Sequence, residues 1–441
     1  MSETVTDTAA LVRTRADKRR RNAVRWFSVL TVVCVAGLGG LGYRGYELAR
    51  QMKGGATSKV ITDPAAPGFV AAVDPTPVHL LALTNADDAL SALIVLVPAT
   101  SGGGGNVVWS LGELVVDVDG TATSLADVYK SDGLAATRSE FEKVLGFGVS
   151  DATVVGPDEL SALAEPVSPL TIKNPDPITV ESKGKRTEKF KAGTLALDAD
   201  ELDEFLTIRA AGEAPENRST RAGVVISALA KALAESGNGS ATTGGGSSSS
   251  AGSTGSTGAS APGDTESSET TGGSSGTSAK GSGDGSGLVT DAGVDLGAVF
   301  GSLGANRIDF TVLPMKRQSF SGSFLYKPDA EGIAAKLADV VQFPVSSFPG
   351  QRPRVRILNG TSDVSKAKAV APDVARAGGE VLLVGNANKF DAATTSVVYS
   401  SDSFADIAQR IATLFGVKAE LSPNMSDAAD IDVVIGADYT K

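Results

Sequence analysis

The hydrophobic pattern of the chain begins with one long apolar run. Residues 26–43 read WFSVLTVVCVAGLGGLGY and carry no charge, whereas residues 1–25 form a basic tail. At about 1.5 Å per helical residue, these 18 positions span roughly 27 Å, close to the thickness of the hydrocarbon core of a bilayer. The run predicts a single transmembrane helix in the cell membrane, with a cytoplasmic N-terminus and an extracellular C-terminus. Because no small-residue cleavage site follows, we expect an uncleaved anchor.

The next pattern is typical of an α/β domain. A juxtamembrane linker at residues 44–75 contains several glycines and prolines, and the domain is expected over residues 76–342. Continuous apolar runs at 78–83 and 92–97 predict buried strands. Apolar residues at helical spacing predict several helices, including a strongly amphipathic one at 221–236.

Residues 237–287 interrupt this domain with a tract made almost entirely of Gly, Ser, Thr and Ala. Such a composition cannot bury enough apolar surface to offset its conformational entropy, so it predicts a disordered segment. Ordered patterns resume with a strand at 307–314 and a helix at 329–341. We therefore expect the tract to be an insertion within one domain.

A second compact unit is predicted over residues 353–441. Strand patterns in RVRILNGT, EVLLVGNA, TTSVVYSS and IDVVIGADY alternate with helical patterns in VSKAKAVAPDVARAGG and FADIAQRIATLFG. Alternating elements of this kind favour a small α/β sandwich. Pro372 predicts a kink or a break in the first of its helices.

Charge and composition exclude several classes of function. The net charge of the chain is −11, and an acidic exterior argues against a nucleic-acid partner, because phosphate contacts need basic surface. Cys34 is the only cysteine, which excludes an intrachain disulfide. His79 is the only histidine, which excludes metal sites built on histidine pairs. Since His79 lies in an apolar strand pattern, we expect it to serve packing.

Residues 354–438 resemble the C-terminal domain of LytR-type cell-envelope proteins. The matching pieces are VRILNGT, GNA, TTSVVYSS and IDVVIGADY, in that order. Residues 76–342 look like a divergent LytR-CpsA-Psr domain, through LADVYKSDG, FEKVLGFGVSDATVVGPDELSALAEPV, GTLALDADELDEFLTIRA and ENRSTRAGVVISALAKAL. The resemblance implies an α/β domain with a mixed central sheet.

The resemblance also implies a chemistry. Proteins of this family transfer a glycopolymer phosphate from a polyprenyl-pyrophosphate lipid to peptidoglycan. Arginines would bind the pyrophosphate, and acidic residues would hold Mg²⁺. Residue by residue, the phosphate-binding arginines correspond to Arg209, Arg218 and Arg221, and the metal ligands correspond to Asp88, within one residue, and Glu113.

The sequence departs from the family pattern at the centre of this site. Gly112 stands where the family has an arginine, and Glu113 stands where it has an aspartate. Loss of one preorganised electrostatic donor commonly costs about 10²- to 10³-fold in rate, so the departure predicts a degenerate phosphotransferase site. Other interpretations remain open. The three arginines could form a solvated helix face or ion pairs with Glu213 and Glu216, and Asp88 and Glu113 could be ordinary surface acids.

Three hypotheses for the function follow. The first is a membrane-anchored binding or scaffold protein of the cell envelope, whose partners are a polyprenyl-phosphate-linked glycan and peptidoglycan or another wall polymer. The second is an active Mg²⁺-dependent phosphotransferase with a rearranged site. The third is a structural protein without a ligand, in which side chains fill the lipid tunnel.

Overall fold

The computed structural model describes residues 61–440, apart from 183, 211–212, 214, 239–289, 291, 321–322, 364 and 426–427. Contacts divide the chain after Asp63, and nearly all described residues belong to the unit Pro64–Lys441. The predicted transmembrane segment 26–43 lies outside the described residues, as does all but the first two residues of the Gly/Ser tract. Within the described part of the chain, no helix is long and apolar enough to cross a bilayer.

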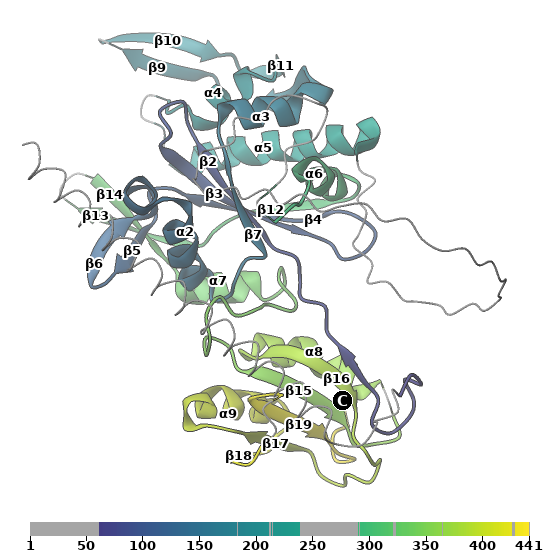
Figure 1. Ribbon diagram of the computed structural model, residues 1–441. Coiled ribbons are helices and arrows are strands. Elements are labelled where there is room, and N and C mark those ends of the chain that lie inside the picture. The colour runs from purple at the N-terminus through teal and green to yellow at the C-terminus, as the bar shows by residue number, and fades with distance from the viewer. Residues whose placement is uncertain are drawn as a thin grey trace, which may run out of the picture. The chain divides into compact units, whose positions relative to one another are not determined.

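A mixed five-stranded sheet forms the centre of the first domain (Figure 1). Its strand order is β12, β4, β3, β2 and β7, with β2 and β3 antiparallel, β3 and β4 antiparallel, and the two outer strands parallel to their neighbours. The strands are β2 (His79–Thr84), β3 (Leu90–Pro98), β4 (Gly105–Leu111), β7 (Asp151–Val155) and β12 (Ile308–Val312). The prediction of a mixed α/β fold is confirmed.

Both faces of this sheet are covered. All six residues of β2 are buried, although successive side chains of a strand point to opposite faces. Helices α5 and α6 pack against each other and against strands of the sheet, and α2 packs against β3 and β7. The helices of this domain are α2 (Leu125–Leu145), α3 (Pro157–Ala164), α4 (Glu201–Thr207), α5 (Pro215–Leu233), α6 (Leu296–Gly304) and α7 (Ala330–Leu337).

Both flanks of the Gly/Ser tract enter the same sheet. Strand β12, which follows the tract, pairs in parallel with β4, which precedes it. The helix on one side, α5, also packs against the helix on the other side, α6. The tract therefore connects two neighbouring parts of one hydrophobic core.

Four antiparallel two-stranded sheets extend the domain. The pairs are β5 (Val115–Val118) with β6 (Thr121–Ser124), β8 (Leu170–Asn174) with β11 (Gly193–Leu197), β9 (Ile178–Ser182) with β10 (Lys185–Phe190), and β13 (Met315–Phe320) with β14 (Ser323–Pro328). Five of the six residues of β10 are exposed, so this strand lacks the apolar alternation by which strands are identified in a sequence.

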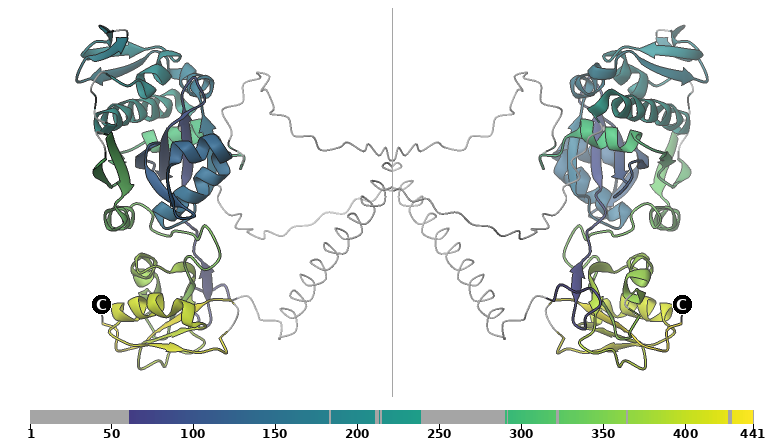
Figure 2. Two further views of the ribbon diagram at one scale, coloured as in Figure 1. Left: turned by 90° about the vertical axis from the view of Figure 1, so that its left-hand side faces the viewer. Right: turned by 90° about the vertical axis from the view of Figure 1, so that its right-hand side faces the viewer.

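The C-terminal domain is a six-stranded sheet with two helices packed into one core (Figures 1 and 2). Its strand order is β1, β16, β15, β19, β17 and β18. The helices α8 (Lys366–Arg376) and α9 (Ala405–Leu414) contact each other. The strands are β1 (Val70–Ala72), β15 (Arg354–Asn359), β16 (Glu380–Asn386), β17 (Ser396–Tyr399), β18 (Ala419–Leu421) and β19 (Ile431–Ile435).

Helix α8 runs through Pro372, so of the predicted kink or break the break is wrong, while the kink stays a prediction. A proline inside a helix costs about 3 kcal/mol. The apolar side of α8, which includes Val370 and Val374, is buried in the core of the C-terminal domain, and this burial offsets that cost.

Strand β1 comes from the segment that the sequence marks as a linker. It pairs antiparallel with β16, and Val70 lies opposite Gly385. The side-chain amide of Asn386 donates to the carbonyl oxygens of Pro64 and Ala66, both at 2.9 Å. A Cβ atom at Gly385 would lie 2.1 Å from the carbonyl oxygen of Phe69, so only glycine admits the strand at this distance. The end of the linker is thus an edge strand of the C-terminal sheet.

Candidate functional site

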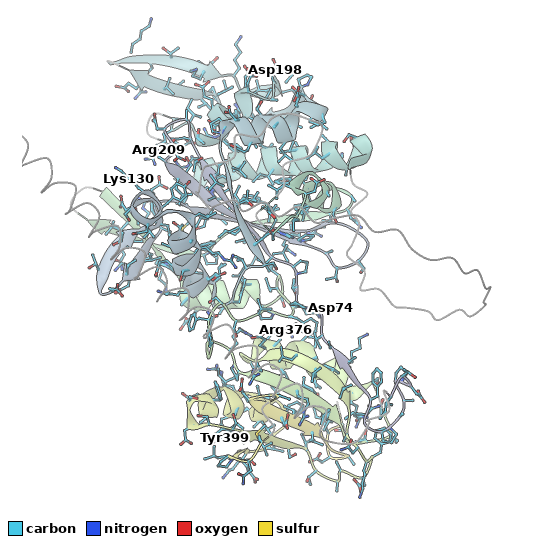
Figure 3. All side chains as sticks on the ribbon, viewed as in Figure 1. Asp74, Lys130, Asp198, Arg209, Arg376 and Tyr399 are labelled. Carbon is cyan, nitrogen blue, oxygen red and sulfur yellow. The ribbon has the colours of Figure 1, made fainter. Side chains whose placement is uncertain are left out.

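Three of the residues predicted from the sequence converge on one point. Glu113 follows the end of β4, Arg209 follows α4, and Arg218 lies in the first turn of α5. The Arg218 Nη2 atom donates to both carboxylate oxygens of Glu113, at 3.1 and 3.0 Å. The Arg209 Nη2 atom donates to the Oε1 atom of the same carboxylate. Of these three residues, Arg209 is the one labelled in Figure 3. One carboxylate therefore holds two guanidinium groups.

The backbone at Gly112 leaves no room for the arginine side chain that the family resemblance implies there, and it also fixes the position of Glu113. Its N–H donates to the carbonyl oxygen of Ser91 at 3.2 Å, and its carbonyl oxygen accepts from the N–H of Ala126 at 2.8 Å. A Cβ atom at Gly112 would lie 2.6 Å from the carbonyl oxygen of Leu90. No side chain fits there without a backbone shift, and the same contacts fix where the next residue, Glu113, begins.

The third arginine, Arg221, has a carboxylate partner of its own. Its Nη1 atom lies 3.1 Å from the Oε1 atom of Glu213, and its Nη2 atom donates to the carbonyl oxygen of Ile208 at 2.8 Å. The guanidinium also lies 5.8 Å from the centre of the Phe205 ring. Burial lowers the pKa of Arg221, although the nearby Glu213 opposes this shift. An arginine nevertheless keeps its charge, so Glu213 serves as its counter-ion.

These contacts bear on the two structural interpretations of the arginines, a solvated helix face and ion pairs with Glu213 and Glu216. Arg218 and Arg221 are 4% and 5% exposed, so they do not form a solvated helix face. Arg221 does pair with Glu213, as that interpretation expects. Arg218 instead pairs with Glu113, a residue 105 positions earlier in the chain.

The two acidic residues assigned to a metal are not brought together by any contact that we observe. Asp88 lies in the turn between β2 and β3, where its φ is 56° and its carboxylate accepts a long hydrogen bond of 3.5 Å from Tyr129. Both oxygens of Glu113 accept hydrogen bonds from two arginines, whose positive charges would repel a cation at the same carboxylate. Within the described ranges, no group of three His, Cys, Asp or Glu residues could hold a metal ion. This arrangement does not fit the implied Mg²⁺.

A polar cavity of about 350 Å³ lies beside Arg221. Its walls carry donors and acceptors of hydrogen bonds, supplied by Asn174, Asp176, Glu213, Asn217, Thr220 and Arg221. Two buried polar atoms of its lining residues have no hydrogen-bond partner in the described part of the chain, Asn174 Oδ1 and Arg221 Nε, whereas Arg221 Nη1 has the carboxylate of Glu213 at 3.1 Å. The loop 174–178 between β8 and β9 was not identified from the sequence, where Asn-Pro-Asp-Pro indicates only a turn.

His79 lies apart from this site and has structural contacts. Its Nδ1 atom is 2.8 Å from Asp151 Oδ1, and Asp151 Oδ2 accepts a hydrogen bond from Thr290 at 2.8 Å. Burial raises the pKa of Asp151, but the hydrogen bonds from His79 and Thr290 outweigh it, so the pKa is lowered overall. The group ties β2, β7 and the segment after the Gly/Ser tract together, which agrees with the packing role expected for His79.

The C-terminal domain matches a known family. Residues 352–439 match the family described as the LytR cell envelope-related transcriptional attenuator. The LytR C-terminal domain predicted from the sequence is therefore confirmed. The match covers about a fifth of the chain, and no curated protein sequence matches the chain.

Solved structures similar to this chain include members of the LytR-CpsA-Psr family. The Bacillus subtilis protein TagV is 12% identical with a TM-score of 0.39, and the match covers 60% of this chain and 94% of that chain. A transcriptional regulator from Enterococcus faecalis is 13% identical with a TM-score of 0.40, over 60% and 86%. The LytR-CPS2A-psr family protein YwtF (TagT), with bound octaprenyl pyrophosphate lipid, is 12% identical with a TM-score of 0.38, over 64% and 93%. Likeness at this level concerns the fold alone.

Proposed function

We propose that this protein is a membrane-anchored, extracytoplasmic protein of the cell envelope that binds a lipid-linked glycan or wall polymer without transferring it. The observation that carries the proposal is the carboxylate of Glu113, which holds Arg209 and Arg218. A phosphotransferase needs such arginines free, because its catalysis rests on positive charge aimed at the transferring phosphoryl group.

The balance of charge in the site supports binding over transfer. Three arginines face two carboxylates, those of Glu113 and Glu213, which leaves one net positive charge. No arginine can be added at position 112, where a Cβ atom would meet backbone. A site with so little free positive charge has no strong means of stabilising a pyrophosphate in a transition state.

The cavity beside Arg221 supports a glycan as the ligand. Sugar hydroxyl groups both donate and accept hydrogen bonds, and this cavity offers amide, hydroxyl, carboxylate and guanidinium groups together. Its volume falls within the range of small-molecule sites. The transmembrane helix proposed at residues 26–43 and the LytR C-terminal domain would keep this site at the envelope.

The test uses the full chain in detergent micelles. We would incubate it with a polyprenyl-pyrophosphate-linked glycan, peptidoglycan and Mg²⁺, and measure both lipid retained on the protein and polyprenyl monophosphate released. We expect retention of the lipid, with release no faster than in a control without protein. Release that requires the protein and disappears in Arg218→Ala would overturn the proposal.

The alternative is an active phosphotransferase with a rearranged site. The convergence of Arg209 and Arg218 beside Arg221 favours it, because this is the cluster that the family resemblance implies. Under this alternative, Arg218→Ala and Arg221→Ala each abolish turnover. We would abandon it if neither substitution changed lipid binding or turnover.

A further inference from the structure

We propose that Glu113 is a specificity-determining residue that acts as an internal ligand of Arg209 and Arg218, so that an external anion binds these arginines only by displacing it. The inference rests on the proposed function and concerns the same site. Glu113 thereby lowers the affinity of these two arginines for phosphate-type ligands.

The contacts of Glu113 are those that a bound anion would make. Two guanidinium groups, from the loop after α4 and from the first turn of α5, donate to one carboxylate. Arginine binds carboxylate and phosphate oxygens with the same planar arrangement of donors. The carboxylate therefore occupies the position in which an external phosphate would contact both arginines.

The exposure of Glu113 and Arg209 makes exchange with an external anion feasible. The Arg218 side chain is 5% exposed, whereas those of Glu113 and Arg209 are 33% and 72% exposed. An anion from solvent can thus reach the outer side of the pair while Arg218 stays in place. Because Glu113 is tethered to the same fold, it competes at a high effective concentration.

The loop that carries Glu113 does not depend on this side chain. Gly112 is held by backbone hydrogen bonds to Ser91 and Ala126, and Leu114 by backbone hydrogen bonds to Leu111 and Leu125. Removing the carboxylate should therefore leave the loop in place and free the two arginines. If Glu113 were only a brace between segments, its removal would lower stability without improving anion binding.

The experiment measures the affinity for inorganic pyrophosphate by calorimetry, with the full chain in detergent at low ionic strength. Glu113→Gln removes the charge and keeps the shape. Glu181→Gln is the matched control, because Glu181 forms an exposed ion pair with Arg186 at 3.2 Å and its loss changes the net charge equally. We expect Glu113→Gln to bind pyrophosphate about tenfold more tightly than the wild type, a difference of about 1.4 kcal/mol, and the control to differ by less than about twofold.

Further variants secure the interpretation. Glu113→Gln combined with Arg218→Ala should lose the gain, and Glu113→Asp, with a shorter side chain, should give an intermediate affinity. Equal affinities of Glu113→Gln and the control would overturn the inference. If Glu113→Gln fails to fold, Glu113→Asp decides, and an affinity equal to that of the wild type overturns the inference.

This result is separable from that of the turnover assay. Turnover by the wild type together with a gain in Glu113→Gln would refute the non-catalytic proposal and leave the role of Glu113 intact. No turnover and no gain would leave the proposed function standing and remove only this inference.

Discussion

A Cβ atom at Gly112 would lie 2.6 Å from the carbonyl oxygen of Leu90, and this distance has a functional consequence. The family resemblance implies an arginine at this position, and its absence alone could be reversed by substitution. The structure adds that the backbone of β3 closes the space around position 112. The departure from the family pattern is therefore built into the fold around this residue.

At the residue scale, sequence reasoning found the charged groups and the partner of Arg221, but it missed the pairing of Arg209 and Arg218 with Glu113. Arg218 and Glu113 were both identified, but each was assigned to a ligand and not to the other. Their pairing joins positions 105 residues apart, and no local pattern encodes such a contact. Asn174 and Asp176 were missed because a turn sequence carries no signal that its side chains line a cavity.

Asp151 should make folding sensitive to acid. Its pKa is lowered in the folded chain, so its stabilising effect is full above the pKa of the unfolded chain and is lost as the pH falls through the lowered value. Asp151→Asn should lower the free energy of unfolding by about 1.5–3 kcal/mol at neutral pH. This difference from the wild type should shrink steadily at acidic pH.

Urea denaturation of the full chain at a series of pH values between neutral and strongly acidic checks this expectation. Asp87→Asn is the control, since Asp87 is exposed in the turn between β2 and β3. A difference between wild type and Asp151→Asn that stays constant across the series would contradict the role given to the pair with His79.

At the element scale, the strands that the sequence predicts well are those buried on both faces. β2 and β3 are continuous apolar runs, and they lie at the predicted positions to within a few residues. The pair β9 and β10 was not predicted, because β10 is almost wholly exposed and polar. β1 was missed for another reason: a strand of three exposed residues is stabilised by its partner β16 and by Asn386, not by its own sequence.

Gly385→Val should detach β1 from the C-terminal sheet, because the new side chain would collide with the backbone of Phe69 and Val70. We expect backbone amides of residues 68–73 to exchange hydrogen for deuterium at least about tenfold faster, since their hydrogen bonds to β16 are lost. Hydrogen exchange followed by mass spectrometry measures this directly.

Gly416→Ala serves as the control for that substitution. Gly416 has φ +69° and no atom within 4 Å of an added Cβ, so alanine there introduces backbone strain without touching β1. Equal exchange of residues 68–73 in both variants would show that β1 does not depend on the space at Gly385.

At the scale of the whole molecule, the Gly/Ser tract joins two segments that pack against each other. Since α5 contacts α6 and β12 pairs with β4, closing this connection does not require a long chain. Loop-closure entropy rises by only about 0.6 kcal/mol for each doubling of length. The sequence predicted that ordered structure resumes after the tract, and the structure has β12 and α6 there. The periodicity of the sequence could not show that β12 pairs with β4.

Shortening residues 240–287 about fourfold should raise the free energy of unfolding by about 1 kcal/mol, because two halvings of loop length reduce the entropy of closure. Thermal denaturation of the full chain with and without the shortening provides the measurement. The control is a variant in which residues 240–287 keep their length and composition but have their order shuffled. A loss of several kcal/mol on shortening would show that the tract itself contributes contacts to the fold.

The edge strand β1 also determines the order in which the chain can finish folding. Val70 lies opposite Gly385, so more than 300 residues must be synthesised between the two partners. The whole first domain is therefore inserted between two strands of the C-terminal sheet, β1 and β15. Contacts of such large sequence separation form slowly. The sheet that contains the first described strand is thus expected to be the last to form. If translation stops before β16, β1 has no strand to pair with.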